Sequence, residues 1–325
     1  MSSVDPQRTF DVMVMATMSA GKSTLINALV GQELLHCANE AATGCLTSLY
    51  YEPAHGQLSA RCYGDENVLL GGPFPAYAPL LQTWNADSSV RQIAIQGRLR
   101  TAMRPAAGLI IHDTPGPNNS QNPAHRMAVE KALDDTPFRS LCYVLNAQQP
   151  GTVDDRALLD QLGALLASRR VVPKVYFVLN KADALDPERG ESLARFVNKT
   201  QGYLEDAGFH NPTIIPMFAG ATLYARKALH NEALTRSQRG LLNGALLTFT
   251  QDKHALVDAS VAPPFAKQNV RRQLRALEHA LADHAPGSEE HRCTALKQLV
   301  MGSGVRMLEA LLSHQRLTAN PHEYH

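Results

Sequence analysis

Apolar residues in the first two thirds of the chain form short runs that alternate with segments of helical spacing. The almost unbroken apolar runs predict buried strands over residues 9–16, 140–146, 174–179 and 213–217. Recurrence of apolar residues every three or four positions predicts helices over residues 22–30, 124–134, 153–168, 188–207 and 221–230. Strands that alternate with helices indicate a mostly parallel sheet with helices on both faces, and such sheets bind ligands at the carboxyl ends of their strands.

The segment between the first helix and residue 113 has a weaker pattern. Residues 49–51 and 58–62 are predicted to form an antiparallel pair of strands, and residues 91–99 and 108–113 two further strands. Residues 64–88 carry Gly and Pro punctuation and are predicted to be irregular.

From about residue 236 the strand patterns end. Apolar residues at helical spacing predict three helices, with breaks near Pro263-Pro264 and Pro286-Gly287. We therefore expect an enlarged α/β domain over residues 1–235, and a helical extension over 236–325 that packs on this domain or on a partner.

Composition narrows the class of protein. The 325 residues carry a net charge of +1, which argues against a basic nucleic-acid-binding protein. No run of 18 apolar residues occurs, and the five cysteines are widely spaced without a CxxC pair. We expect a cytoplasmic protein without a zinc site. Residues 236–325 are mildly basic, with 11 Lys and Arg against 8 Asp and Glu, which suits a solvated surface or contact with anionic lipid or a partner.

A phosphate-binding loop is predicted at residues 16–23, Ala-Thr-Met-Ser-Ala-Gly-Lys-Ser, between a strand and a helix. It fits the pattern GxxxxGK[ST] except that Ala16 replaces the first glycine. Gly21 lets the backbone approach closely, Lys22 would neutralise the β and γ phosphates, and the Ser23 hydroxyl would bind Mg²⁺. The candidate nucleotide-binding residues of this loop are Met18, Ser19, Ala20, Gly21, Lys22, Ser23 and Thr24.

A second motif follows the predicted strand 108–113, where residues 113–116 read Asp-Thr-Pro-Gly. In a DxxG motif at this place, Asp113 would help to hold the Mg²⁺ shell and Gly116 would donate its backbone N–H to the γ phosphate. Alone, the motif is weak, because a surface Asp that starts a turn has the same pattern more often.

A third motif, Asn-Lys-Ala-Asp at residues 180–183, directly follows the strand that ends at Leu179. The Asp183 carboxylate would accept two hydrogen bonds from guanine, and adenine would leave it unpaired. Asn180 would brace the loop and the base edge, while the Lys181 stem would pack along the base. Ala219, after the strand 213–217, is a weaker candidate to meet the guanine carbonyl through its backbone N–H. Together the motifs predict a guanine-nucleotide-binding domain.

Residues 18–29, Met-Ser-Ala-Gly-Lys-Ser-Thr-Leu-Ile-Asn-Ala-Leu, together with the long segment up to the DTPG motif, resemble the GTPase domain of the dynamin superfamily, especially its bacterial members. The resemblance covers about residues 9–235. It implies hydrolysis of GTP to GDP and phosphate with Mg²⁺, and a switch threonine that touches the metal and orients the attacking water. Thr43 is our choice for this role and Thr47 the alternative.

The resemblance also bears on turnover. Pro117 stands where small GTPases place a glutamine, and Met18 stands where dynamins carry a glutamine beside the serine that is kept here as Ser19. We expect slow basal turnover that is stimulated by dimerisation across the nucleotide face. The candidate catalytic residues are Ser19, Lys22, Thr43 and Gly116, and the candidate metal ligands are Ser23, Thr43 and Asp113.

The alternative function is a nearly inactive, GTP-regulated binding module that acts through a partner carrying a stalk or a lipid contact. About eight residues precede the first predicted strand and about 90 follow residue 235, which is too few for a dynamin stalk of normal length. We therefore expect GTP or GDP as ligand, a homodimer or a dynamin-like partner, no nucleic acid, and at most peripheral contact with a membrane.

Overall fold

A computed structural model describes residues 9–17, 19–36, 45–52, 54, 56–100, 108–115, 133, 136, 138–149, 151–185 and 190–319. Its centre is a nine-stranded sheet with the order β4-β3-β5-β2-β6-β1-β7-β8-β9. The strands are β1 (Phe10–Ala16), β2 (Leu46–Tyr51), β3 (Ser59–Tyr63), β4 (Leu69–Pro75), β5 (Gln92–Gly97), β6 (Leu109–Asp113), β7 (Ser140–Asn146), β8 (Lys174–Asn180) and β9 (Thr213–Met217).

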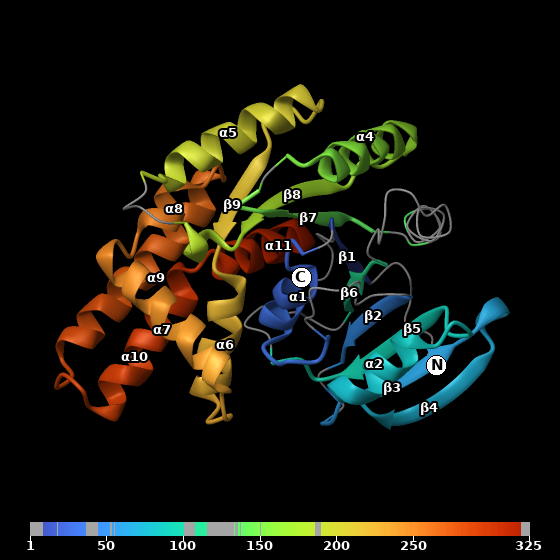
Figure 1. Ribbon diagram of the computed structural model, residues 1–325, viewed down its shortest axis with the longest axis horizontal. Helices are drawn as coiled ribbons and strands as arrows, with labels where there is room; N and C mark the ends of the chain where they lie inside the picture. The colour runs from blue at the N-terminus through green and yellow to red at the C-terminus, as the bar shows by residue number, and fades with distance from the viewer. Residues whose placement is uncertain are drawn as a thin grey trace.

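The helices cover both faces and one end of this sheet (Figure 1). Those of the first 235 residues are α1 (Lys22–Val30), α2 (Ala78–Ala86), α4 (Val153–Ser168), α5 (Leu193–Asp206) and α6 (Ala219–Leu229), with short 3₁₀ turns η2 (Asp65–Asn67) and η3 (Ala182–Ala184). They are followed by α7 (Arg236–Gln251), α8 (Ala255–Ala259), α9 (Pro264–Ala282), α10 (Glu289–Gly302) and α11 (Val305–Ala319).

The α/β class predicted from the alternating pattern is confirmed. Strands β6, β1, β7, β8 and β9 run parallel to one another, while β2 pairs with β6 in the antiparallel direction. The predicted bounds of β7, β9 and α4 coincide with the structure, because each of these segments has strong periodicity and clear end signals. The helix predicted over residues 124–134 lies outside the described residues apart from Leu133.

The prediction for the first half of the sheet is wrong in two respects. Strands β2 and β3 do not pair with each other, because β5 lies between them, parallel to β2 and antiparallel to β3. Residues 64–88 are not irregular either, since they form η2, the edge strand β4 and helix α2. Strand β4 tolerates Pro73 and Pro75 because an edge strand has one side without a ladder to donate to.

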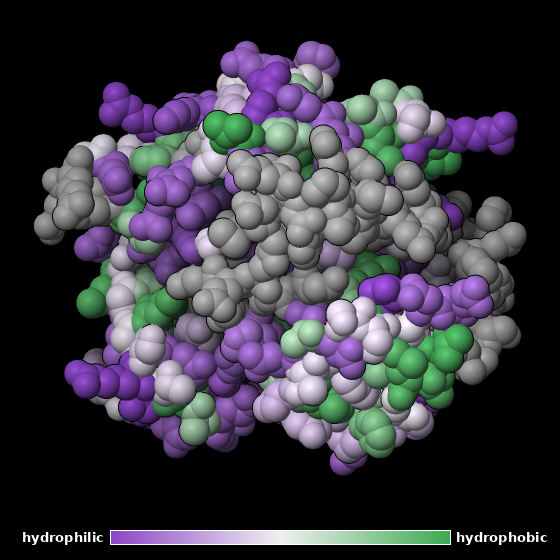
Figure 2. All heavy atoms as spheres, turned by 45° about the vertical axis from the view of Figure 1, so that its right-hand side comes forward, coloured by the Kyte–Doolittle hydropathy of each residue, from purple (hydrophilic) through white to green (hydrophobic). Residues whose placement is uncertain are grey.

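Large apolar side chains gather on the exposed side of this edge. Val68, Leu69, Leu70, Phe74 and Tyr77 are each about half exposed, and hydrophobic surface is visible in the same part of the molecule in Figure 2, at the lower right. The Phe74 and Trp84 rings lie 6.2 Å apart, so α2 covers part of the strand. The edge of the sheet is thus apolar and only partly covered.

Side chains of the central strands divide into two cores, as expected for a sheet buried on both faces. Val12 and Val14 of β1 face the core that contains Leu25 and Ile26 of α1 and residues of α11. Met13 and Met15 face the second core, which contains residues of α4 and α5. Helix α1 ends at Gly31, whose φ of 75° supplies the left-handed cap.

The last third of the described chain is helical, as predicted, but contains five helices where the periodicity predicted three. The breaks before Pro264 and around Pro286 are confirmed, while residues 252–254 and Ser303-Gly304 add two more. Gly304 passes so close to β9 that a Cβ there would lie 2.3 Å from the Pro216 carbonyl oxygen. A glycine is therefore required where α11 turns back onto the sheet.

Helix α11 is joined to α1 and α6 by buried charges. The Arg226 guanidinium donates to Glu309 Oε1 at 2.7 Å and also to the Ala28 carbonyl. Arg306 completes the cluster with a 2.7 Å hydrogen bond to Glu309 Oε2. Within the described part of the chain, no helix is long and apolar enough to cross a membrane.

Candidate functional site

The predicted motifs meet at one edge of the sheet. Each follows a strand of the parallel block β6-β1-β7-β8-β9: the phosphate loop follows β1, the DTPG motif begins at the end of β6, and the NKAD motif begins at the end of β8. Because neighbouring parallel strands point the same way, their carboxyl ends share this edge. Ala219, directly after β9, belongs to the same edge.

The phosphate loop turns tightly into α1. Ala20 N–H donates to the Thr17 carbonyl at 3.4 Å, and Ser19 and Gly21 have φ values of 62° and 93°. Lys22, Ser23 and Thr24 form the first turn of α1, so their N–H groups belong to the donors that a helix leaves unpaired at its start. Met18 lies outside the described residues.

Gly21 packs directly against the Asn180 side chain. A Cβ at residue 21 would lie 2.3 Å from Asn180 Nδ2 and 4.0 Å from Lys181 Cε. The loop can therefore approach the NKAD motif this closely only with glycine at position 21.

Asn180 is the side chain that ties the motifs together. Its Nδ2 donates to the Ala20 carbonyl at 3.0 Å, and its Oδ1 accepts from the Ala219 N–H at 3.3 Å. Asn180 is only 2% exposed, so both bonds are shielded from water. The structure thus brings Ala20, Gly21, Asn180 and Ala219 together.

Asp183 lies in η3, the single turn that follows β8. Burial raises the pKa of its carboxyl, and its own backbone N–H and the Lys181 ammonium partly offset this rise. Lys181 begins the turn with a φ of 61°. A half-buried carboxylate held at the rim of the same edge is suited to accept hydrogen bonds from a ligand.

Lys22 and Asp113 form a buried ion pair across the site. The ammonium contacts Asp113 Oδ1 and donates to the Thr114 carbonyl at 2.7 Å. The side chains are 8% and 2% exposed. Thr114 Oγ1 in turn donates to the Val14 carbonyl at 2.9 Å, which fixes the start of the DTPG motif against β1. Gly116 lies outside the described residues.

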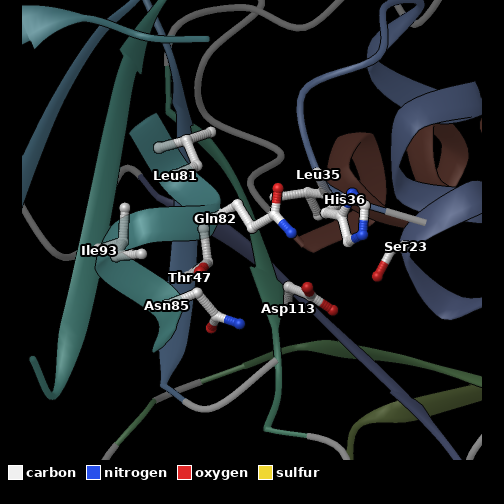
Figure 3. A pocket seen from close by; sticks show the side chains of 9 residues that line it. All are labelled: Ser23, Leu35, His36, Thr47, Leu81, Gln82, Asn85, Ile93 and Asp113. Carbon is white, nitrogen blue, oxygen red and sulfur yellow. The ribbon is translucent and has the colours of Figure 1, made fainter. Parts of the chain in front are cut away.

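A pocket opens beside this pair and is lined by side chains from α1, β2, β6 and α2 (Figure 3). Ser23, Thr47 and Asp113 supply oxygen atoms, and Thr47 lies opposite Asp113 in the antiparallel pairing of β2 with β6. Thr43 lies outside the described residues. Gln82 and Asn85 of α2 also line the pocket, a contribution hidden from sequence because residues 64–88 were expected to be irregular.

These donors fit magnesium. Hydroxyl and carboxylate oxygens are hard ligands, and Mg²⁺ is usually held by one or two protein groups together with substrate phosphates. Within the described residues there is no cluster of three or more His, Cys, Asp or Glu that could hold a metal ion.

Two further residues near the site, Cys45 and Asp155, lie outside the sequence motifs. Burial raises the pKa of the Cys45 thiol to about 12, and the neighbouring Asp113 charge adds to the effect. Asp155, at the start of α4, accepts a hydrogen bond from Thr17 of the phosphate loop at 2.8 Å. The one sequence signal for Asp155 is the capping pattern Thr-x-x-Asp at residues 152–155, which predicts a helix start and no role in the site.

The chain was compared with family models and with solved structures, and both comparisons find dynamins. The family model described as the dynamin family matches residues 12–182. Two solved structures of an oligomerised bacterial dynamin pair, described as a mechanism for long-range sensing and tethering of membranes, share the fold with TM-scores of 0.51 and 0.50, at 18% and 19% identity. They cover 86% and 84% of this chain, which spans 44% and 50% of theirs.

A weaker likeness is to Era in complex with MgGDPNP and 16S ribosomal RNA, with a TM-score of 0.37 and 14% identity over 65% of this chain and 51% of that one. No curated protein matches the chain in sequence.

Proposed function

The chain belongs to the dynamin family, and from this premise we propose that its GTPase domain binds GTP with Mg²⁺ and hydrolyses it to GDP and phosphate. The observation that carries the proposal is the pair of hydrogen bonds made by Asn180. One reaches the phosphate loop at Ala20 and the other reaches Ala219, where α6 begins after β9. A single ligand that has phosphates at one end and a base at the other would span these two loops.

Each motif binds a different part of the nucleotide. The phosphates lie along the N–H groups of residues 18–24, with Lys22 moving from Asp113 to the β and γ phosphates. Guanine lies against Lys181 and beside the Asp183 carboxylate. The Ala219 N–H donates to Asn180 Oδ1 in the nucleotide-free chain, so it meets the guanine carbonyl only when that bond opens. Because the ionised carboxylate can only accept hydrogen bonds, it pairs with the guanine N–H groups and finds no partner on adenine.

Ser23 and Asp113 would hold Mg²⁺, with Thr43 or Thr47 completing the protein's share of its shell. When bound there, Mg²⁺ would supply positive charge to offset the negative charge that develops on the phosphates in hydrolysis. The ion pair of Lys22 with Asp113 supports this arrangement, because the carboxylate needs a new cation when the ammonium turns to the phosphates.

Turnover by the single chain is slow in this proposal. Pro117 has no side-chain group to orient water, and Met18 replaces the glutamine usual in dynamins. Ser19, Gly116 and Thr43 remain as groups to place the water and the γ phosphate. A second copy, or a dynamin-like partner, packed across the nucleotide face would exclude water and complete the site.

Residues 1–235 form the GTPase domain in this account, and residues 236–325 form the helical extension that packs on it. The contacts of α11 with α1 and α6 support this packing, because they link the extension to the helix that starts at the phosphate loop. We place the protein in the cytoplasm, with any membrane contact peripheral and made through the assembled form, since the related structures are of oligomers that tether membranes.

The test is GTP turnover measured over a hundredfold range of protein concentration, with Lys22→Ala as the control. A specific rate that rises with concentration and is absent from Lys22→Ala is expected. A specific rate that stays constant contradicts stimulation by dimerisation. GTP binding without turnover above the Lys22→Ala level contradicts the hydrolase and supports the alternative, a GTP-regulated binding module, which Met18 and Pro117 favour.

A further inference from the structure

Asp155 divides its two carboxylate oxygens between two tasks. Oδ2 belongs to the start of α4, where it accepts from the Thr152 N–H at 3.2 Å and from Thr152 Oγ1 at 2.9 Å. Oδ1 accepts from Thr17 Oγ1 of the phosphate loop at 2.8 Å, across 138 positions of sequence. Asp155 is 2% exposed, so water does not compete for either oxygen.

A helix cap alone does not account for Oδ1. The capping box is complete with Oδ2 and the bond from the Asp155 N–H to Thr152 Oγ1. The Tyr143 hydroxyl, from β7, lies 3.4 Å from Oδ1 on the buried side. Thr17 is the group that brings the phosphate loop to this carboxylate.

The bond to Thr17 fixes the turn that shapes the loop. The Thr17 carbonyl accepts from the Ala20 N–H at 3.4 Å, which closes residues 17–20. Within this turn Ser19 has a φ of 62°, a conformation that a residue with a Cβ keeps only where its surroundings hold it. Both ends of the turn are held: Ala20 by Asn180 and Thr17 by Asp155.

We propose that Asp155 is a positioning residue of the phosphate loop, which holds Thr17 so that the loop between β1 and α1 keeps the shape in which it receives the nucleotide phosphates. The inference rests on the proposed function, because it assigns Asp155 to the same nucleotide site. It also explains how the loop keeps its shape with Ala16 in place of the usual first glycine: a side-chain anchor supports the turn directly after that position.

The experiment compares variants of the full chain by two measurements, the affinity for GDP with Mg²⁺ and the melting temperature without nucleotide. Thr17→Val keeps the shape and removes the donor, so we expect GDP affinity to fall about tenfold or more, the effect of losing a hydrogen bond to a charged group. Thr17→Ser restores the hydroxyl and should bind within about twofold of the wild type. Thr17→Ala is the second variant should Thr17→Val not fold.

Thr152→Ala is the matched control, because it removes the hydroxyl donor to Oδ2 and the side-chain cap of α4 but leaves the Thr152 N–H and the bond to Thr17. It should lower the melting temperature and leave GDP affinity within about twofold. Asp155→Ala should weaken GDP binding, and should weaken it no further in a Thr17→Val background, since both changes remove the bond between Thr17 and Asp155.

Three results would overturn the inference. The first is a Thr17→Val variant that binds GDP as the wild type does, and the second is a Thr152→Ala variant that loses as much affinity as Thr17→Val. In either case the wild type still binds GDP and the proposed function stands. The third, a wild-type chain without measurable GDP affinity, overturns the proposed function and the anchor with it.

Discussion

Asn180 Nδ2 lies 3.0 Å from the Ala20 carbonyl oxygen, so the loop after β8 is bonded to the loop after β1 across the edge of the sheet. Asn180 Oδ1 receives the Ala219 N–H at 3.3 Å on its other side. The Asn180 amide thus donates to the phosphate loop and accepts from the start of α6. The relative position of these two segments therefore depends on Asn180.

Asn180→Ala is expected to uncouple the loops. Each lost hydrogen bond in a buried place costs about 1–3 kcal/mol, so GTP affinity should fall on the order of a hundredfold, together with a lower melting temperature. Calorimetric titration and thermal unfolding measure the two effects. Unchanged affinity would mean that the two loops do not act together on a ligand.

Gly21→Ala tests the close approach of the phosphate loop to Asn180 by a change in the loop itself. The added methyl would lie 2.3 Å from Asn180 Nδ2, and alanine is strained at a φ of 93°. We expect loss of GTP binding and destabilisation of about 1–3 kcal/mol. Gly163→Ala is the matched control, because a Cβ there meets nothing within 4 Å. Inside α4 it should stabilise by about 0.5–1 kcal/mol.

Asp183→Asn should raise stability and weaken GTP binding at once. Burial raises the pKa of the Asp183 carboxyl, so its charged form destabilises the folded chain at neutral pH. A group with a raised folded pKa contributes stability below its unfolded pKa and loses it as pH rises through the folded value. The gain from Asp183→Asn in the nucleotide-free chain should thus be present at pH 7 and vanish below about pH 4.

The same variant should change which base is bound. An amide can donate where the carboxylate only accepts, so the variant should lose GTP affinity and gain affinity for xanthosine triphosphate, which has a carbonyl in place of the guanine amine. Competition binding measures both. A variant that keeps full affinity for GTP would remove Asp183 from the base site.

Lys22→Ala should destabilise the chain even without nucleotide. The change leaves the buried Asp113 carboxylate without the ammonium, and breaking a buried pair by removing one partner costs about 3–5 kcal/mol. Denaturant unfolding measures this cost, with Lys199→Ala, on the exposed surface of α5, as the control. If both variants unfold alike, the Lys22–Asp113 pair does not stabilise the nucleotide-free state.

Glu309→Gln tests whether the helical extension and the GTPase domain form one folding unit. Glu309 is 1% exposed and neutralises Arg226 and Arg306. Its loss should cost about 3–5 kcal/mol and shift a single unfolding transition. Glu290→Gln, on the exposed face of α10, should have no effect. A transition that splits in two would show that residues 236–325 fold separately.

Local pattern and chain order predicted the parts of the fold that depend on neighbours in sequence. The strand 140–146 and the helix 153–168 are continuous, periodic and capped, so their bounds follow from the residues themselves. Strand β4 was not predicted because Gly71, Gly72 and Pro73 are typical of turns. Only the place of β4 at the edge of the sheet permits these residues in a strand. The insertion of β5 between β2 and β3 is set by tertiary packing, which no local pattern encodes.

The site likewise has a part that the sequence motifs predict and a part that depends on tertiary packing. Asp113 and Asn180 stand at strand ends and Lys22 begins the helix after β1, all within recognisable motifs, so their meeting at one edge follows from a parallel sheet. The bond from Thr17 to Asp155 joins residues 138 positions apart. Its sequence signal, a helix cap, explains only one oxygen of the carboxylate, and the other oxygen's partner depends on how α4 packs beside the loop.

The measurement that most directly tests the account is binding of GTP, GDP and ATP to the full chain with Mg²⁺, by calorimetry. The Asp183 carboxylate and the phosphate loop together predict that GTP and GDP bind and compete with each other, and that ATP binds on the order of a thousandfold or more weakly, since adenine leaves the half-buried Asp183 carboxylate unpaired. ATP affinity within about tenfold of GTP affinity, or no binding of either guanine nucleotide, would contradict it.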